Sequence, residues 1–192
     1  GYTSWSGSSM ASPIAAGTIG LLRSFNMDWT NEMLETMILA TADPVIYDIN
    51  TEDYLQGKLG TGRVDALRSL STDLFPRFEL IGSDFFLPND ASGIVSAGDA
   101  LEVMVILLND EGWGTAINIT GILSADSDEI SIQNPTMNFD DAFPGMPIVN
   151  DSSPYEVELS LTIQPGEYEF ILTLTANEVD GIGYEADFGF TL

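Results

Sequence analysis

The spacing of apolar residues changes its period once along the chain, and this change constrains the fold more than any other feature. Up to about residue 75, apolar residues recur at three- and four-residue intervals, which is typical of helices. From about residue 78 onward they alternate with polar residues. The sequence therefore predicts an α+β chain, with a helical region (residues 1–75) and a β-region (residues 76–192) that meet within "STDLFPRFEL", residues 71–80.

The β-region is expected to form an antiparallel sandwich. Alternating segments of similar length, separated by Gly, Pro, Asn and Asp, are typical of two packed antiparallel sheets. The segments are "LEVMVILL", "TAINITGILS", "YEVELSLTI", "YEFILTLTA" and "YEADFGFTL". In the third of them, the alternation predicts a buried face made of Tyr155, Val157, Leu159, Leu161 and Ile163. Because the chain has no cysteine, the sandwich is expected to be immunoglobulin-like in architecture only.

The helical region is expected to hold two longer helices and a short one. "SMASPIAAGTIGLLRSF" is apolar or small on nearly every side, which predicts a helix that is buried all round. In "DWTNEMLETMILATA", Thr30 is a suitable N-cap, and Met33 and Met37, each with the residue that follows it, repeat at helical spacing. Pro44 is expected to stop this helix. A short helix is expected around "RVDALRSL", residues 63–70.

Acidic residues dominate the charge of this chain. It carries 30 acidic and five basic residues, and residues 76–192 hold 21 of the acids but a single base, Arg77. A net charge of −25 repels nucleic acid and anionic membranes, so we expect neither as a partner. No apolar run is long enough to span a bilayer. The acidity is typical of a solvated surface suited to salt water, as in a marine bacterium, or to an extracellular setting.

The stretch "SGSSMASP", residues 6–13, places a serine at an expected helix start. A serine hydroxyl is a weak nucleophile that needs a base, and the free N–H groups of a helix N-terminus favour a developing oxyanion. Gly7 permits a tight bend, and Pro13 is expected about one turn into the helix, where a missing N–H costs little. On these residues alone, Ser9 is either such a nucleophile or a serine that caps the helix.

The stretch "WSGSSMASPIAAG" resembles the serine motif of the subtilisin-like serine proteases, or subtilases. The matching residues are Gly7, Ser9, Met10, Ala11, Ser12, Pro13, Ala16 and Gly17. Ser8 replaces the usual Thr, and Ile14 replaces a frequent His that is not the base of the triad. "LGTGRVDALRSL", residues 59–70, resembles the G-x-G-x-V-D-A segment that closes the subtilase catalytic domain, in the right order. The resemblance covers residues 1–75 and implies that Ser9 is the nucleophile.

The same resemblance implies that the catalytic machinery is incomplete in these 192 residues. In subtilases the aspartate and histidine of the triad precede the serine, and so does the side-chain oxyanion donor. The chain contains no histidine. Because triad members act as a unit, we expect the chain alone to be proteolytically inactive. A Ser–Lys pair that uses Lys58 is the alternative within the chain.

The serine helix is also expected to need a cover. In the subtilase fold it runs through an α/β sandwich whose sheet comes from the preceding segment, and "MASPIAAGTIGLL" alone would expose a large apolar surface. The sequence has no initiator Met and no signal segment, so we expect a piece of a longer precursor. The expected cover is the N-terminal part of the same protease, self-association, or docking onto the β-region.

The β-region resembles the CARDB-like (cell-adhesion-related) modules that follow secreted bacterial proteases. The residues that carry this resemblance are "LEVMVILLNDEGWGTAINITGILSADSDEISI", "NFDDAFPG", "IQPGEYEFILTLTAN" and "YEADFGFTL". It implies a spacer, stabiliser or binding domain. Calcium is the one possible cofactor, since it prefers six to eight oxygen ligands, and the candidate ligands are Asp126, Asp128, Asp140 and Asp141. The alternative is that these acidic loops are simply solvated.

Two further short patterns are expected to be structural. Asn118 and Asn150 each begin a glycosylation sequon, a pattern that is common by chance. Trp5 and Trp113 are expected to pack against the protein rather than to stack on a ligand.

Together, these features predict the C-terminal portion of a secreted subtilisin-like serine endopeptidase. It hydrolyses peptide bonds through an acyl-enzyme at Ser9, with the histidine and aspartate supplied by an upstream segment and a protein or peptide as substrate. The alternative is a catalytically inert structural or assembly subunit, such as a surface or fibre protein, built on a protease remnant and a β-sandwich. The two ordered motifs favour the first hypothesis, and the missing triad residues favour the second.

Overall fold

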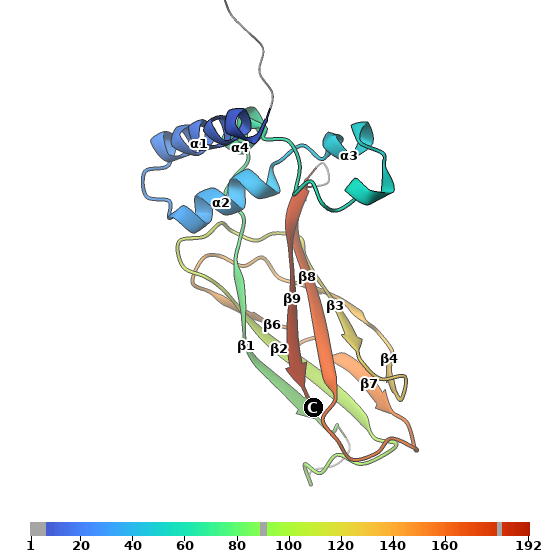
Figure 1. The fold of residues 1–192 in the computed structure, drawn as a ribbon. Helices are drawn as coiled ribbons and strands as arrows, with labels where there is room; N and C mark the ends of the chain where they lie inside the picture. Colours follow the sequence, from blue (N-terminus) through green and yellow to red (C-terminus); the bar gives the residue numbers. More distant parts are fainter. Residues whose placement is uncertain (1–6, 89–91, 180–181) are drawn as a thin grey trace, which may run out of the picture. The chain divides into compact units, whose positions relative to one another are not determined.

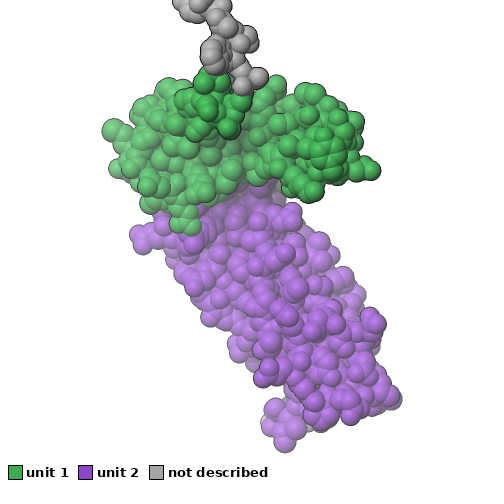
Figure 2. All heavy atoms as spheres, in the orientation of Figure 1, with its two compact units in different colours: residues 1–74 green, residues 75–192 purple. Residues whose placement is uncertain are grey.

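The computed structural model describes residues 7–88, 92–179 and 182–192. It divides into two compact units, unit 1 (Gly1–Leu74) and unit 2 (Phe75–Leu192), which are coloured separately in Figure 2. Unit 1 is helical and unit 2 is made of antiparallel sheets, so the predicted α+β class is confirmed. Among the described residues, no helix combines the length and the apolar character needed to cross a membrane. Trp5 lies outside the described residues.

Unit 1 consists of short helices joined by loops (Figure 1). Its elements are α1 (Ser8–Phe25), α2 (Asn31–Ala40), α3 (Val45–Ile49), the 3-10 helix η1 (Asp53–Leu55) and α4 (Ala66–Ser71). Thr30 caps α2 as predicted, because its Oγ1 accepts a hydrogen bond from the Met33 N–H at 3.2 Å. Asp65 caps α4 in the same way, because its Oδ1 accepts a hydrogen bond from the backbone N–H of Arg68 at 2.9 Å. The sequence did not predict α3 and η1.

The small core of unit 1 lies where α1, α2 and α4 meet. Leu22 of α1 and Met37 of α2 are completely buried. The remaining members of the predicted α2 stripe are buried as well: Met33, Leu34 and Ile38. The apolar spacing of α2 therefore identified the face that packs.

A buried chain of hydroxyl groups joins the end of α2 to α4. The Thr41 and Ser69 hydroxyl oxygens lie 2.6 Å apart, and Ser69 Oγ donates to the Asp65 carbonyl at 2.8 Å. Thr41 Oγ1 also bonds the Met37 carbonyl at 2.5 Å. An unpaired buried hydroxyl would cost about 1–3 kcal/mol, so these bonds allow both side chains to be buried without that cost.

The described residues of unit 2 form nine strands in two antiparallel sheets (Figure 1). The strands are β1 (Phe78–Phe86), β2 (Ala100–Asn109), β3 (Ile119–Ala125), β4 (Ile130–Ile132), β5 (Thr136–Phe139), β6 (Pro147–Val149), β7 (Tyr155–Leu159), β8 (Glu169–Val179) and β9 (Ile182–Thr191). One sheet has the order β1-β2-β7-β4, with β6 also paired to β2. The other has the order β5-β3-β8-β9.

The two sheets share one hydrophobic core. Alternate residues of β2, such as Val103 and Val105, and of β8, such as Leu172 and Leu174, have no more than 2% of their surface exposed and belong to the same cluster. Tyr155 of β7 crosses this core, and its hydroxyl donates to the Gly121 carbonyl of β3 at 3.1 Å. Burial raises the pKa of Tyr155 far above its usual value, so the phenol stays neutral.

A buried asparagine side chain extends the first sheet. The Oδ1 of Asn150 accepts a hydrogen bond from the Val105 N–H at 2.8 Å, and its Nδ2 donates to the Val103 carbonyl at 3.2 Å. Its side-chain amide thus replaces a backbone partner of β2 between the end of β6 and the start of β7. Only 5% of Asn150 is exposed, so in the folded protein this sequon does not present a free amide.

The predicted strand "YEVELSLTI" is only partly formed. β7 ends at Leu159, and the next apolar residue of the pattern, Leu161, is 84% exposed. The chain turns at Ser160, because the Ile163 N–H donates to the Ser160 carbonyl at 3.3 Å and the Thr162 N–H donates to the Ser160 hydroxyl at 3.2 Å. The prediction that Leu161 is buried is wrong, although Ile163 returns to the core.

Candidate functional site

Ser9 occupies the second position of α1. The N-cap of this helix is Gly7, whose φ of 140° is in a region that favours glycine, and no side chain caps the helix. The alternative interpretation of Ser9 as an N-cap is therefore wrong. Ser9 is exposed, and within the described residues its hydroxyl takes part in no hydrogen bond. Its hydroxyl lies in the first turn of the helix, where the Met10 and Ala11 N–H groups already donate to the Gly7 carbonyl, at 2.9 and 3.1 Å, and those of Ser8 and Ser9 have no helical acceptor.

Pro13 lies four residues after Ser9 inside the same helix. In a regular helix, residue 13 would donate its N–H to the carbonyl of residue 9, but proline has no N–H and its ring crowds that carbonyl. The Ser9 carbonyl therefore lacks its helical hydrogen bond. Pro13 is the sixth residue of α1, beyond the four N–H groups that are free in every helix, so the low cost expected for this position is wrong.

Only one side of α1 packs inside unit 1. Thr18 and Leu22 are buried, and Ala15 and Ile19 are half-buried, so these four residues form the inner face at helical spacing. This face meets α2 and α4. The prediction of a helix buried all round is therefore not met in unit 1, because these two helices cover a single side of α1.

A second apolar stripe on α1 is exposed to solvent. It runs at i, i+4, i+7, i+11 and i+15, and we call it the outer stripe: Met10, Ile14, Gly17, Leu21 and Phe25. Ile14 is 64% exposed and Phe25 is 75% exposed. A Cβ added at Gly17 would meet no atom within 4 Å, so the surface is open there. Exposed apolar patches are found at interaction sites, in ligand-binding grooves and on surfaces that are prone to aggregate.

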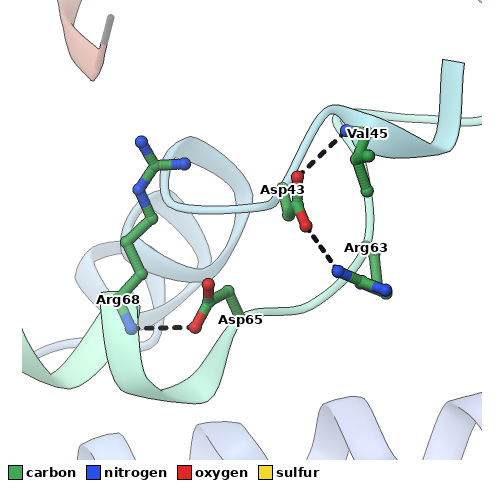
Figure 3. Close-up of polar contacts among 5 residues, drawn as sticks. All are labelled: Asp43, Val45, Arg63, Asp65 and Arg68. Atoms are coloured by element: carbon green, nitrogen blue, oxygen red, sulfur yellow. Dashed lines mark hydrogen bonds and ion pairs between the residues drawn. The ribbon is translucent and has the colours of Figure 1, made fainter. Parts of the chain in front are cut away.

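The second motif, "GTGRVDA", forms a structural clamp between two loops (Figure 3). Asp43 and Arg63 pair as a β-bridge, with backbone N···O distances of 2.7 and 2.8 Å. Their side chains also form an ion pair in which Arg63 Nη2 lies 2.6 Å from Asp43 Oδ2. The backbone N–H of Val45, which bonds Asp43 Oδ1 at 3.0 Å, and the Arg63 guanidinium hold the pKa of Asp43 below its usual value.

Gly62 allows these two loops to approach each other. Its φ is 145°, and a Cβ at this position would lie 2.3 Å from the carbonyl oxygen of Asp43. Only glycine fits there without displacing the bridge. Asp65 follows as the cap of α4, so successive residues of the motif have separate structural roles. Within the described residues, none of the hydrogen bonds of Asp43 or Asp65 reaches Ser9.

Lys58, the alternative base, is exposed in the loop that follows η1. No hydrogen bond joins its side chain to Ser9 among the described residues. A nucleophile and its base are expected within hydrogen-bond reach, although the distance is often longer in a free enzyme. Among the described residues of unit 1, no base is therefore bonded to the Ser9 hydroxyl.

The four calcium candidates are exposed and lie in two different loops. Asp126 and Asp128 lie between β3 and β4, and Asp126 Oδ1 accepts a hydrogen bond from the Glu169 N–H at 3.2 Å. Asp140 and Asp141 follow β5 and line a polar hollow of about 460 Å³ together with Asn118. No group of three or more acidic side chains in the described part of the chain is arranged to hold a metal ion. Calcium binding remains a prediction.

Trp113 packs against the start of unit 2, as expected. It is 9% exposed, and the Arg77 guanidinium lies over its ring, 5.5 Å from the centroid. Arg77 also pairs with Asp110, at 3.4 Å between Nε and Oδ2. The single base of unit 2 thus belongs to the beginning of β1, where it holds the strand entry against the neighbouring loop.

A known family model matches one part of the chain. Residues 1–67 match the Subtilase family model, Peptidase_S8. The match includes Ser9, the whole of α1 and α2, and the Asp43–Arg63 clamp. It ends within α4, and no curated protein matches the chain.

Three solved structures resemble parts of the chain weakly. Native alpha-2-macroglobulin from Escherichia coli, from domain MG7 to the C-terminus, has a TM-score of 0.40 and 11% identity, over 62% of this chain and 17% of that one. A family 123 glycoside hydrolase from Clostridium perfringens has a TM-score of 0.28 and 15% identity, over 50% and 21%. A conjugative transposon lipoprotein from Bacteroides eggerthii has a TM-score of 0.28 and 16% identity, over 59% and 93%. The chain thus spans less than a quarter of the first two structures.

Proposed function

We propose that unit 1 is the nucleophile-bearing part of a secreted subtilisin-like serine endopeptidase, with Ser9 as the nucleophile. The observation that carries the proposal is the position of Ser9, exposed in the first turn of an 18-residue helix within the segment that matches the Subtilase family. A serine in this setting has free backbone N–H groups beside it that favour negative charge on an attacked carbonyl.

In this proposal, Ser9 Oγ attacks the carbonyl carbon of a peptide bond and forms an acyl-enzyme, which water then hydrolyses. A histidine takes the hydroxyl proton and returns it to the leaving amine, and an aspartate orients the histidine. Since the chain holds no histidine, these groups come from polypeptide outside the 192 residues. Alone, the chain has no triad, and removal of triad members costs nearly all of the triad's rate enhancement.

The outer stripe of α1 supports an arrangement in which more polypeptide packs on unit 1. Ile14 and Phe25 are mostly exposed, and full burial of one such side chain is worth about 1.5–3 kcal/mol. We propose that the polypeptide that carries the histidine and aspartate covers this stripe. The same contact would then complete both the core and the catalytic triad.

The direct test is labelling of Ser9 by a fluorophosphonate probe. The chain is co-expressed with the polypeptide that its gene encodes upstream of Gly1, and the complex is purified and labelled. We expect labelling of the complex, no labelling of the chain alone, and loss of labelling in Ser9→Ala. Ser12→Ala is the matched control, since Ser12 is another exposed serine of α1 and should leave labelling intact. A stable complex without label at Ser9 would refute the proposal.

The second candidate function is that of an inert structural or assembly subunit. The absence of histidine from all 192 residues favours it. In this case the outer stripe is covered by other copies of the chain. Intact mass and gel filtration of the natural protein distinguish the two functions: a homo-oligomer without an upstream fragment supports assembly, and a pair with an upstream fragment supports the protease.

For unit 2 we propose a spacer or binding role in an extracellular protein. Its surface charge suits that setting: residues 76–192 carry 21 acidic residues and one base. Its two-sheet core is separate from the core of unit 1. Such a domain can therefore keep its fold whichever of the two functions unit 1 has.

A further inference from the structure

An apolar pocket opens at one end of the sandwich of unit 2. It has a volume of about 570 Å³ and is bordered by the β1–β2 connection, the β7–β8 connection and the end of β9. Its apolar lining includes Val95, Leu159, Ile163, Pro165, Tyr168 and Leu192. A pocket of this size accommodates one or two large side chains, and it has no part in the proposed chemistry of Ser9.

Hydrogen bonds fix the walls of this pocket. Tyr168 and Leu192 exchange two backbone hydrogen bonds, at 3.2 and 3.0 Å, and the Tyr168 hydroxyl donates to the Gln164 carbonyl at 2.8 Å. On the other wall, the Ser96 N–H donates to Asp99 Oδ2 at 2.7 Å. These bonds hold the lining residues Ser96, Gln164, Tyr168 and Leu192 in place without a ligand, which lowers the entropic cost of binding.

Exposed apolar side chains lie next to the pocket. Leu161, between the lining residues Leu159 and Ile163, is 84% exposed, and Ile94, beside Val95, is 69% exposed. Leu161 lies over Gly98, where a Cβ would be 2.6 Å from Leu161 Cδ2. A leucine that leaves the sheet and extends into solvent beside an apolar pocket provides surface for a partner to bury.

The surroundings of the pocket are acidic. Asp99, whose carboxylate accepts from the lining residue Ser96, and exposed Glu167, between the lining residues Gly166 and Tyr168, lie at its edge. Glu158 and Glu169 lie on the outward faces of β7 and β8 and take no part. Arg77 is the one basic residue of residues 76–192. It directly precedes β1, whose first residue, Phe78, pairs with Asn109 at the C-terminal end of β2. The pocket lies beside the N-terminal end of β2, since Val95, Ser96 and Ala97 of its lining precede that strand. A ligand that enters this apolar pocket therefore meets only negative formal charge from the chain segments that form it.

We propose that this pocket binds a short basic peptide segment, with a large aliphatic or aromatic side chain in the pocket and Lys or Arg on either side. The apolar lining and Leu161 take the central side chain. The flanking carboxylates attract the cations and repel anionic ligands such as fatty acids, so charge selects among apolar ligands. An extended peptide can present a central apolar side chain with a cationic side chain on either side of it.

The probe is a synthetic hexapeptide of sequence KKLFKK, added to the isotope-labelled full chain and followed by amide chemical shifts. We expect shifts at the pocket residues, weaker binding as NaCl is raised from about 0.05 to about 0.5 M, and no binding of EELFEE or KKSSKK. Leu161→Ser should weaken binding by about fivefold or more, because apolar area buried by the peptide is lost. Leu161 is exposed, so this variant folds.

The matched control is Ile122→Ser on the outward face of β3, where an exposed isoleucine lies away from the pocket. It should leave peptide affinity unchanged. Equal binding of KKLFKK and EELFEE, shifts confined to other surfaces, no binding of KKLFKK, or equal effects of the two variants would each overturn the proposal. Dimerisation of the free chain through Leu161 would also overturn it and would assign the pocket to a second copy.

Discussion

Among the described glycines of unit 1, Gly62 alone has other atoms within 4 Å of the place where a Cβ would lie. We expect Gly62→Ala to lower the free energy of unfolding of unit 1 by about 2–4 kcal/mol, because the new Cβ would lie 2.3 Å from the Asp43 carbonyl oxygen at a φ of 145°. Gly60→Ala is the matched control, with a positive φ but no atom within 4 Å, and should cost about 1 kcal/mol. Urea unfolding followed by far-UV circular dichroism measures both. Equal losses would show that the clash is relieved elsewhere.

The carboxylate of Asp43 reports on the same clamp. Its folded pKa lies below the usual 3.8, so the clamp is fully stabilised above that pH and weakens as the pH falls through the folded pKa. We expect Arg63→Gln to raise the pKa of Asp43 only part of the way, because the hydrogen bond from Val45 remains. A carboxyl titration by NMR measures this change. A pKa at its usual value in the unsubstituted chain would contradict the clamp.

At the level of single elements, α1 is a helix whose hydrogen-bond ladder is interrupted at the Ser9 carbonyl by Pro13. Pro13→Ala restores the hydrogen bond to the Ser9 carbonyl and should raise the free energy of unfolding of unit 1 by about 1–3 kcal/mol. Pro44→Ala is the control, since Pro44 is at the N-cap of α3 and blocks no helical bond. Thermal unfolding followed by circular dichroism compares them. A destabilised Pro13→Ala variant would mean that the proline ring contributes packing that outweighs its missing N–H.

In unit 2, the side chain of Asn150 acts as part of a strand. Asn150→Ala leaves the Val105 N–H and the Val103 carbonyl buried without partners, and should cost about 2–4 kcal/mol. The exchange of the Val105 amide hydrogen should accelerate in the variant. Asp151→Ala, at the exposed neighbouring position, should change stability by less than about 0.5 kcal/mol. Unchanged exchange at Val105 would exclude this role for Asn150.

The elements that could be predicted from the sequence are those with a long regular pattern. β2 and β8 alternate over ten or more residues, and α2 repeats its apolar residues over three turns. β4 and β6 have three residues each, which is too short for a period to show, and β1 contains a register shift between Leu80 and Gly82 that interrupts its alternation. Leu161 was misjudged because the strand ends in a turn at Ser160, where the Ile163 N–H bonds the Ser160 carbonyl, while the apolar alternation of the sequence continues through that turn.

In the candidate site, too, local sequence patterns could be recognised and contacts between distant residues could not. The motif strings predicted a role for Ser9, which stays a prediction, and marked the segment around Gly62, because each motif consists of immediate neighbours in the sequence. The Asp43–Arg63 bridge joins residues twenty positions apart, so no spacing rule could indicate it. The apolar composition of α1 predicted a helix covered on every side. It could not indicate that unit 1 covers a single side of the helix.

At the level of the whole molecule, apolar attraction and charge repulsion oppose each other. The outer stripe of α1 favours self-association, and a net charge of −25 resists it. Screening shortens the range of charge interactions from about 10 Å at 0.1 M salt to about 3 Å at 1 M. We therefore expect the isolated chain to be monomeric at low salt and to associate as salt is raised, as measured by sedimentation velocity.

A matched pair of variants tests this balance. Ile14→Glu should abolish the association, because it places a charge in the middle of the outer stripe. Ile122→Glu makes the same change on an exposed face of unit 2 and should have less effect. If the chain is monomeric at every salt concentration, or if the two variants behave alike, the outer stripe does not drive contact between copies.

Arg77 is the last basic residue of the sequence, and this affects how proteases digest unit 2. Enzymes of the trypsin type cut after lysine or arginine, and no such residue follows Arg77 in the sequence. Once they have cut there, residues 78–192 remain as one fragment even when the sandwich is unfolded. Resistance to this class of digestion therefore comes from composition and does not depend on temperature, denaturant or the integrity of the fold. In a medium that contains basic-specific proteases, unit 2 would outlast the helices that precede it.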